Sequence, residues 1–569
     1  MNLDPSRLDL SAAARQAVGK AYARPVDLAQ RLETHRAGVL RLPPHPDWSG
    51  DMLDWAADPF SDRNWQFQHH TLRWLAPVLW AALDGDEQAR AEWLATAQSW
   101  FEANVPASKA ASSFAWKDMA DGNRAINLSL GAALVGQEDA WFVELLEAHR
   151  DWLMDESHIV GKNHGLHQHA GLFVVGAVLR DGAAMDTAVK RMTAQFTTTF
   201  DEQGCNDEGS AAYHQMNLAW WSQAWDRVAL EGRPIPEAVR ASMAAAEDVL
   251  VHLAQPDGRI PQIGDSARGP LRPGHGPLAE FVASQGRRGT RPEGTVRVLD
   301  GGYVLSRSGW GESRPIADES HMVLRHGRDV RAHAHHDLGS VHLYSHGTPW
   351  LVDGGFHSYQ PKDPTRKYLH SRAAHNVAVI PGLEHDDSAD VRLERAEVTG
   401  EAHDFVLADL GYSEVSLRRR VTYLVELDCW IVWDSADSPE RRLVQQWQVE
   451  PGVTVQLRDR GFRLRSSRSA LNMTWLGAAP RLRRHQAVEG DQRGWIGTRW
   501  KTSVPSNLLT AEAAAGPRGA AVLVAPAGRE PLGVVDSYIT SQGALTASLV
   551  RGGHVWALSI DEDVSVRES

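Results

Sequence analysis

The chain has 569 residues, 43% of them hydrophobic, which is enough for two or more domains with cores of ordinary size. Its formal net charge of -13 argues against the broad basic surface of a nucleic-acid-binding protein, and no stretch approaches the roughly 20 apolar residues that span a bilayer. We therefore expect a soluble protein, monomeric or homodimeric, whose partners include neither a nucleic acid nor a membrane.

The N-terminal segment and the cysteines limit the compartment and the metal chemistry. Residues 1–16 contain acidic side chains and no apolar run, so they do not resemble a secretory signal, and we expect a cytoplasmic protein. Cys205 and Cys429 are the only cysteines, which excludes a disulfide framework and a cysteine-based metal cluster. Any metal ion would need histidine and carboxylate ligands.

Residues 60–255 show helical periodicity. Short turns with Gly or Asp separate the apolar runs, and no alternating β-branched segment lies between them, so this half is expected to be all-α. Ser61 or Asp62 is a plausible N-cap of the first run. Most of the tryptophans are expected in the core, although some could stack on a sugar face. The runs are Trp65, Leu72, Leu75, Leu79 and Leu83, followed by stretches within 93–101, 141–152 and 185–196.

After about residue 295 the pattern changes to short β-rich runs broken by Gly, Pro and Asp, which indicates an antiparallel sandwich. The Gly-, Pro- and Arg-rich stretch 256–294 is the expected connection. We predict a multidomain α+β protein with a helical domain over 1–290 and a β domain over 291–569. The β-rich runs are 302–306, 341–344, 418–425, 429–433 and 522–524.

The densest histidine segment is His-Ala-His-His-Asp at 333–337. If this segment is a strand, its first, third and fifth side chains share one face and His336 faces the other way. Asp353 and His375 follow later in the chain. A lone histidine on a strand is most often structural, but two histidines, a carboxylate and a third histidine are ligands that suit zinc. The group as a whole predicts a metal site.

Several motifs resemble those of the heparinase II/III superfamily of polysaccharide lyases. In the β half they are H-x-H-x-D at 333–337, G-x-P-x-L-V-D-G-G at 347–355, and Tyr368 with S-R-A-A-H-N at 371–376. The helical half adds Asn-His-Gly at 163–165 and E-x-S-x-x-Y-H at 208–214, with weaker matches at Trp116, Arg124, Asn127 and 264–266. The resemblance spans about residues 60–450. The Arg366-Lys367 pair and the last hundred residues depart from it.

The resemblance implies that the N-terminal domain is an incomplete (α/α) toroid and the catalytic domain, and that a C-terminal antiparallel β-sandwich follows it. It implies one structural Zn²⁺ per chain, held by His335, Asp353 and His375. The catalytic residues that it implies are Tyr213, His333, Asn163 and His164. We assign substrate contacts to Trp116, Arg124, Glu208, His214, Arg331 and Tyr359, and Arg331 could form a positive cluster with Arg325 and Arg328.

The chemistry of β-elimination fits these residue types. Cleaving a 4-linked uronate requires removal of the C5 proton, stabilisation of charge at the carboxylate and protonation of the leaving O4. Asn163 can donate to the carboxylate, and His164 or His333 can add positive charge or accept a proton. Tyr213 can reach C5 and O4 when both are on the same face, and neighbouring cations must then lower its pKa from about 10. For the other epimer His333 would be the base and Tyr213 the acid.

Other functions remain open from the sequence. An (α/α)-toroid glycoside hydrolase would need a carboxylate pair, which Glu144, Asp207, Glu208 and Asp265 could supply. A metal-dependent hydrolase with the motif H-x-H-x-D-H is disfavoured, because Leu stands at position 338, where that motif has its final histidine. A non-catalytic carbohydrate-binding protein is the third alternative. Asn163 could instead cap a helix and Tyr213 could be a core residue. The polymer, whether glycosaminoglycan or alginate, its sulfation, and endo or exo action are left undecided.

Overall fold

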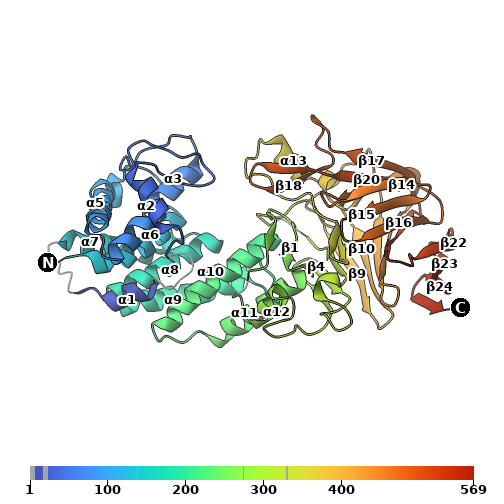
Figure 1. Ribbon diagram of the computed structural model, residues 1–569, viewed down its shortest axis with the longest axis horizontal. Helices are drawn as coiled ribbons and strands as arrows, with labels where there is room; N and C mark the ends of the chain where they lie inside the picture. Colours follow the sequence, from blue (N-terminus) through green and yellow to red (C-terminus); the bar gives the residue numbers. More distant parts are fainter. Residues whose placement is uncertain (1–6, 17–23, 137–138, 273, 329–330, 569) are drawn as a thin grey trace. The chain divides into compact units, whose positions relative to one another are not determined.

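The computed structural model describes residues 7–16, 24–136, 139–272, 274–328 and 331–568 (Figure 1). Residues 1–6, which belong to the segment judged not to be a secretory signal, lie outside the described residues. The chain forms two compact units, one of Met1–Thr199 with Ala219–Ala241 and the other of Phe200–Leu218 with Ser242–Ser569. Among the described helices, none is both apolar and long enough to cross a bilayer.

The first unit is helical. The division between the units falls within α10 and α11, and two short helices, α12 (Pro277–Ala283) and α13 (Pro364–His370), belong to the second unit. The helices that precede them are α1 (Leu10–Gln16), α2 (Leu28–Arg36), α3 (Arg63–His70), α4 (Ala76–Leu83), α5 (Glu87–Asn104), α6 (Met119–Leu130), α7 (Ala140–Met154), α8 (Lys162–Val178), α9 (Gly182–Thr199), α10 (Ala211–Leu230) and α11 (Glu237–Leu253).

The first predicted helical run is interrupted. Asp62 is the N-cap of α3, and its side chain accepts a hydrogen bond from the Asn64 amide at 2.8 Å, as the sequence predicted. The continuation to Leu83 as one helix is wrong, because Leu72 adopts a left-handed conformation with φ 56° between α3 and the next helical turn. Pro77 stands in the first turn of α4, where a proline is tolerated because its missing N–H has no helical partner.

Helices α6 and α8 approach closely at two glycines. A Cβ on Gly122 would lie 2.2 Å from the backbone oxygen of His167, and one on Gly171 would lie 2.6 Å from that of Gly122. No side chain can be placed at such distances. Both helices are mostly buried, so α8 forms part of the centre of the helical unit and its first turn is held firmly.

The second unit is built from antiparallel sheets. The eight-stranded sheet has, in spatial order, β14 (Thr454–Arg458), β15 (Gly461–Arg465), β16 (Ala470–Leu476), β21 (Ala520–Pro526), β12 (Cys429–Ala436), β11 (Leu417–Leu424), β10 (Ala402–Asp409) and β9 (Val391–Val398). The nine-stranded sheet has β17 (Arg481–Gln486), β20 (Asn507–Ala515), β13 (Ser438–Val449), β7 (Thr348–Leu351), β6 (Val341–Ser345), β5 (His321–Arg325), β4 (Tyr303–Arg307) and β3 (Val296–Leu299), with β8 (Ala378–Val379) beside β13.

Three smaller sheets complete this unit. The pairs are β1 (Arg259–Ile260) with β2 (Gly269–Pro270), and β18 (Trp495–Arg499) with β19 (Thr502–Pro505). A four-stranded sheet contains β22 (Gly533–Ile539), β23 (Leu545–Arg551), β24 (His554–Ile560) and β25 (Val564–Glu568).

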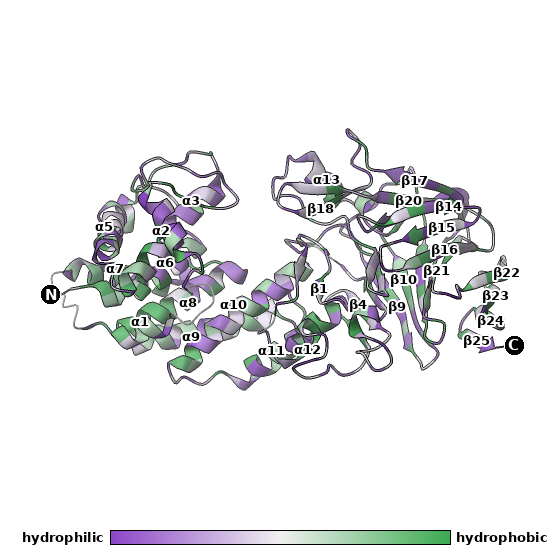
Figure 2. Cartoon of the chain, viewed as in Figure 1, coloured by the Kyte–Doolittle hydropathy of each residue, from purple (hydrophilic) through white to green (hydrophobic). Residues whose placement is uncertain are grey.

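Strand β12 is buried on both faces. Trp430 and Val432 belong to the core between the two large sheets, whereas Ile431 and Trp433 face a second core shared with the four-stranded sheet. The neighbouring strand β21 is apolar along its whole length for the same reason (Figure 2). The predicted fold class, an N-terminal (α/α) toroid followed by an antiparallel β-sandwich, is confirmed. The division between residues 290 and 291 stays a prediction, because the compact units follow packing rather than the change from helices to strands.

Candidate functional site

Three of the predicted site residues meet within the second unit. Tyr213 lies in the first turn of α10, and its ring stacks on that of His333 with centroids 3.6 Å apart and planes inclined by 12°. Its phenol oxygen is 3.0 Å from that of Tyr359, which is 42% exposed. Phe356 and Trp500 pack around Tyr359. The cluster therefore joins an imidazole and two phenols beside exposed surface.

The segment that carries His333 is not a strand. Residues 331–340 form turns and irregular backbone between β5 and β6, so the predicted strand alternation is wrong. His333 and His335 still reach a common partner, Asp265. Asp337 does not join them, because it pairs with the fully buried Arg325 at 3.2 Å. A buried guanidinium needs such a partner, which explains why Asp337 is unavailable to a metal or a substrate.

Asp265 contacts both His333, a predicted catalytic residue, and His335, a predicted metal ligand. Its Oδ2 is 3.0 Å from His333 Nδ1, its Oδ1 is 3.2 Å from His335 Nε2, and Arg366 Nη1 donates to Oδ1 at 3.1 Å. Burial opposes ionisation, but the two histidines and the Arg366 charge hold the pKa of Asp265 well below its usual range. From the sequence, Asp265 was a candidate for a hydrolase pair and part of a weak family match at 264–266, and no spacing rule indicated these contacts.

Glu208 lies on the other side of His333. Its carboxylate is 3.5 Å from His333 Nε2, and its backbone oxygen accepts from the His333 amide at 3.1 Å. Gly209 follows with φ +73°, and a Cβ there would lie 2.8 Å from that of Ala334. Glu208 is only 2% exposed, so the structure gives it a contact to His333 in place of the direct substrate contact that we expected.

The electrostatic surroundings of Tyr213 differ from the expectation. Burial, Tyr359, Asp265 and Glu208 all raise the pKa of the Tyr213 phenol above its usual value. The cations that a phenolate base would require are not among these dominant influences. The expectation of a lowered pKa is therefore wrong, because these surroundings favour the protonated phenol.

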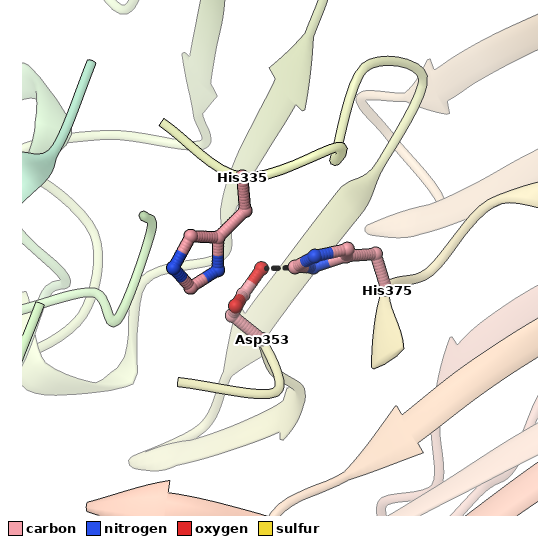
Figure 3. Close-up of side chains that lie close together, drawn as sticks. All are labelled: His335, Asp353 and His375. Atoms are coloured by element: carbon pink, nitrogen blue, oxygen red, sulfur yellow. Dashed lines mark hydrogen bonds and ion pairs between the residues drawn. The ribbon is translucent and has the colours of Figure 1, made fainter. Parts of the chain in front are cut away.

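The predicted metal ligands form a buried group. His335, Asp353 and His375 offer ligand atoms that all lie within 4.8 Å of one another, and Asp353 lies between the two imidazoles (Figure 3). Asp353 follows β7 and His375 follows a short turn after α13, so the three ligands come from three separate loops rather than from adjacent strands. His335 Nδ1 and His375 Nε2 are buried and have no hydrogen-bond partner among the described residues.

His375 Nδ1 lies 2.9 Å from Asp353 Oδ2, so an imidazole in contact with a carboxylate stands beside a second imidazole with an unpaired buried nitrogen, which is the donor set of a histidine–carboxylate metal site. The triad could therefore hold a metal ion. Asn376, next to His375, ties the surrounding segments together: its amide donates to the Val341 and Val352 carbonyls, and its oxygen accepts from the Gln448 amide at 2.6 Å.

In the helical unit, Asn163 and His164 lie in the first turn of α8. The N-cap is Gly161, so the alternative reading of Asn163 as a helix cap is wrong. Asn163 is 7% exposed, and the half-exposed His164 has its Nδ1 2.5 Å from the Asp118 carboxylate. The His164 contact outweighs the effect of burial and lowers the pKa of Asp118. The first turn thus presents an amide and an imidazole together.

Arg124 and Trp116 do not have the solvent-facing positions that we expected for substrate contacts. Arg124 is fully buried, with its guanidinium 3.9 Å from the Trp100 ring centroid, and it donates to His149 Nε2 and to the His70 carbonyl, both at 2.9 Å. Burial lowers its pKa to about 9. Trp116 packs in the same cluster and donates to the Asn104 carbonyl. Arg124 is therefore enclosed in the helical core, while the substrate contact of Trp116, which is 9% exposed, stays a prediction.

His214 and Arg331 also have contacts other than those expected. His214 is 4% exposed, its Nε2 is 2.8 Å from the Ala246 carbonyl, and burial lowers its pKa to about 4, which gives it a structural place. Arg331 is half-buried and donates to the Gly301 carbonyl at 3.1 Å. Arg325 and Arg331 lie near one another, since they donate to the carbonyls of the adjacent Gly302 and Gly301, but Arg325 is buried and paired with Asp337.

Models of known protein families match both halves of the chain. Residues 11–271 match the model of the heparinase II/III N-terminus, and residues 290–501 match that of the heparinase II/III-like C-terminal domain. No curated protein matches the sequence of the chain.

The fold is similar to that of a heparan sulfate lyase of Pedobacter heparinus, with TM-score 0.76, 16% identity and 97% of this chain and 94% of that chain covered. A heparinase III gives TM-score 0.76, 16% identity and coverage of 98% and 93%. A chondroitin AC lyase of Streptomyces coelicolor A3 gives TM-score 0.56, 12% identity and coverage of 98% and 92%. At these identities the likeness shows the fold alone.

Proposed function

The chain belongs to the heparinase II/III family and is a polysaccharide lyase, and we propose that it cleaves a uronic-acid-containing glycosaminoglycan by β-elimination. The product would carry an unsaturated uronate at its new end. The heparan sulfate and chondroitin lyases of similar fold support an acidic polysaccharide as the substrate class. Alginate, another polymer of uronates, is the second candidate, because the site residues named above do not distinguish sulfated from unsulfated uronates.

One observation carries the proposal: the stacked pair of Tyr213 and His333 beside the exposed Tyr359. A lyase needs a group that protonates the leaving O4, and a phenol held protonated by its surroundings can do so. We assign that step to Tyr213. His333, whose two ring nitrogens lie near Asp265 and Glu208, removes the C5 proton when that proton is on the opposite face of the sugar. For a same-face substrate, Tyr213 must first lose its own proton.

We also assign catalytic roles to Asn163 and His164, which lie in the first turn of α8. Deprotonation at C5 moves negative charge onto the uronate carboxylate, so a neutral amide donor there stabilises the transition state more than the ground state. The amide of Asn163 supplies such a donor without adding a competing base. The imidazole of His164 adds positive charge when it is protonated.

We further propose that the metal ion is Zn²⁺, held by His335, Asp353 and His375. Two imidazoles and a carboxylate are a donor set that zinc favours. The two cysteines of the chain are both buried, and neither belongs to this group of ligands. When bound, the ion would link three loops and neutralise Asp353. The residues assigned to proton transfer do not include its ligands.

The proposed function is tested by product chemistry. The purified chain should be incubated with heparan sulfate, chondroitin sulfate, dermatan sulfate, hyaluronan and alginate, as polymers and as oligosaccharides. A lyase product absorbs in the ultraviolet because its uronate is unsaturated, whereas a hydrolase gives new reducing ends without that absorbance. Reducing ends alone would contradict the proposal and favour the hydrolase alternative. The panel also separates the two uronate epimers, and hence the two assignments of the base.

Asn163→Ala should lower kcat more than it raises KM. Removing one donor to a developing charge costs about 10²–10³-fold in kcat in comparable sites. Steady-state kinetics on the best substrate of the panel measures both constants. Asn127→Ala is a matched control, since Asn127 is also a buried amide of the helical unit but donates to the Thr71 carbonyl. If Asn163→Ala changed KM alone, Asn163 would be a binding residue only.

A further inference from the structure

Asp265 is held rigidly between three segments that are distant in sequence. Its amide donates to the His333 carbonyl at 2.9 Å, while the His333 amide donates to the Glu208 carbonyl at 3.1 Å. The preceding Gly264 has φ +64°, and a Cβ there would lie 2.5 Å from the His333 oxygen and 2.6 Å from the Gly209 oxygen. Any other residue at position 264 would push these segments apart. The Asp265 carboxylate therefore has little freedom to move.

The two oxygens of this carboxylate contact different rings. Oδ2 is 3.0 Å from His333 Nδ1, and Oδ1 is 3.2 Å from His335 Nε2. The contact with His335 is shielded from water, since Asp265 is 4% exposed and His335 is 3% exposed, whereas the His333 side chain is partly exposed. A carboxylate accepts hydrogen bonds and donates none, so each of these two ring nitrogens must carry a proton to make a bond.

This requirement fixes what the opposite nitrogen of each ring can do. In neutral His335, a proton on Nε2 leaves Nδ1 as the lone-pair nitrogen, and Nδ1 is the buried atom without a partner beside Asp353 and His375. In neutral His333, a proton on Nδ1, the nitrogen closer to a carboxylate, leaves Nε2 as the lone-pair nitrogen, and Nε2 lies 3.5 Å from the Glu208 carboxylate. One residue thus sets the orientation and tautomer of a proposed metal ligand and of a proposed catalytic base.

We propose that Asp265 is a positioning residue that couples the metal centre to His333 through its two carboxylate oxygens. The inference rests on the proposed function, because it assumes that His333 takes part in proton transfer. In this proposal the metal centre also influences the position of His333, which a purely structural ion would not do. Because one rigidly held carboxylate bonds to both rings, a change in its hydrogen bond with His335 alters the hydrogen bond that it makes with His333.

Asp265→Asn is the sharpest test, because the amide keeps the shape but has one accepting oxygen and one donating nitrogen. It can accept from only one of the two rings and must donate to the other, which forces that histidine into the opposite tautomer. We expect zinc affinity to fall by about 10–100-fold, which is the usual effect of removing a partner behind a ligand. We also expect kcat measured at saturating zinc to fall by at least about 10-fold, with KM little changed.

Asp409→Asn is the matched control. Asp409 is likewise buried and accepts from a histidine and an arginine, His385 at 2.9 Å and Arg372 at 2.8 Å, but it contacts neither the proposed ligands nor Tyr213. Its loss should lower the melting temperature while zinc affinity and kcat stay near those of the wild type. If Asp265→Asn does not fold, Asp265→Glu replaces it, because a longer carboxylate keeps the charge beside Arg366 but cannot keep both distances.

The outcomes separate this inference from the proposed function. Zinc affinity is measured by competition with a chelator and needs no substrate. An Asp265 variant with unchanged zinc affinity, or one whose kcat recovers fully when zinc is saturating, would overturn the coupling. Failure of the wild type to form an unsaturated product, or full activity of Tyr213→Phe, would instead overturn the proposed function. In that case, a loss of zinc affinity in the Asp265 variant would still show its contact with the metal centre and remove only the link to catalysis.

Discussion

Tyr213→Phe should remove nearly all turnover, by about 10²–10⁴-fold, and leave the fold intact. The change deletes one oxygen, and that oxygen is the group proposed to protonate the leaving O4. The ring that stacks on His333 remains, and only the hydrogen bond to Tyr359 is lost. That bond lies beside exposed surface, so its loss should cost about 1 kcal/mol of stability or less.

The measurement is kcat on the best substrate of the panel, together with a thermal melt of each protein. Tyr344→Phe is the matched control, because Tyr344 is also a phenol of the second unit but its hydroxyl donates to the Ala317 carbonyl at 2.8 Å. The control should melt at a lower temperature and keep its kcat. If Tyr213→Phe kept activity within a few-fold of the wild type, Tyr213 would have no part in proton transfer.

His335→Ala should abolish metal binding and destabilise the second unit. Protein purified without added metal should contain close to one zinc per chain, and the variant should contain almost none, because two remaining ligands hold zinc poorly. At a free zinc concentration about 1,000 times the Kd, binding stabilises the folded chain by about 4 kcal/mol. The loss should appear as a lower melting temperature, and adding a chelator to the wild type should give the same shift.

Two further variants distinguish metal loss from other effects. His403→Ala removes another buried histidine of the same unit, whose Nδ1 is 2.8 Å from the Ser306 hydroxyl, and it should lower stability while keeping the zinc. His333→Ala should keep the zinc and lose activity on at least some substrates, although a modest loss of zinc affinity would accompany any shift of Asp265. A wild-type chain without metal, or zinc retained in full by His335→Ala, would contradict the assignment of the ligands.

The fold class followed from the sequence because each half has one dominant period. Apolar residues at helical spacing must share a face to be buried, and the five apolar residues 429–433 can be buried together only in a strand covered on both sides. Strand β12 is such a strand. The Asp62 cap was likewise local, since it depends only on residues 62–64. Signals of this kind need no knowledge of distant segments.

The candidate metal ligands were also within reach of the sequence. Two histidines and an aspartate, at 335, 375 and 353, are residue types that share the ability to bind a metal ion, and their side chains meet in the structure. What the sequence could not provide was the conformation between them. The strand expected at 333–337 is irregular backbone. Asp337 is buried in an ion pair with Arg325, and the backbone amide of His333 donates to the Glu208 carbonyl. These partners lie far away in the chain or on another segment.

Burial and charge were decided only by the tertiary structure. Arg124 occurs in a motif and carries a charge, so the sequence favoured a substrate contact, but the packing of Trp100, Trp116 and His149 encloses it. The pKa of Tyr213 is raised first by burial and then by Tyr359 and the carboxylates of Asp265 and Glu208, all of which folding brings to one ring. A pKa depends on the summed field of neighbours in space, and spacing along the chain does not encode that sum. For the same reason the link that Asp265 makes between His333 and His335 became visible only once three distant segments were folded together.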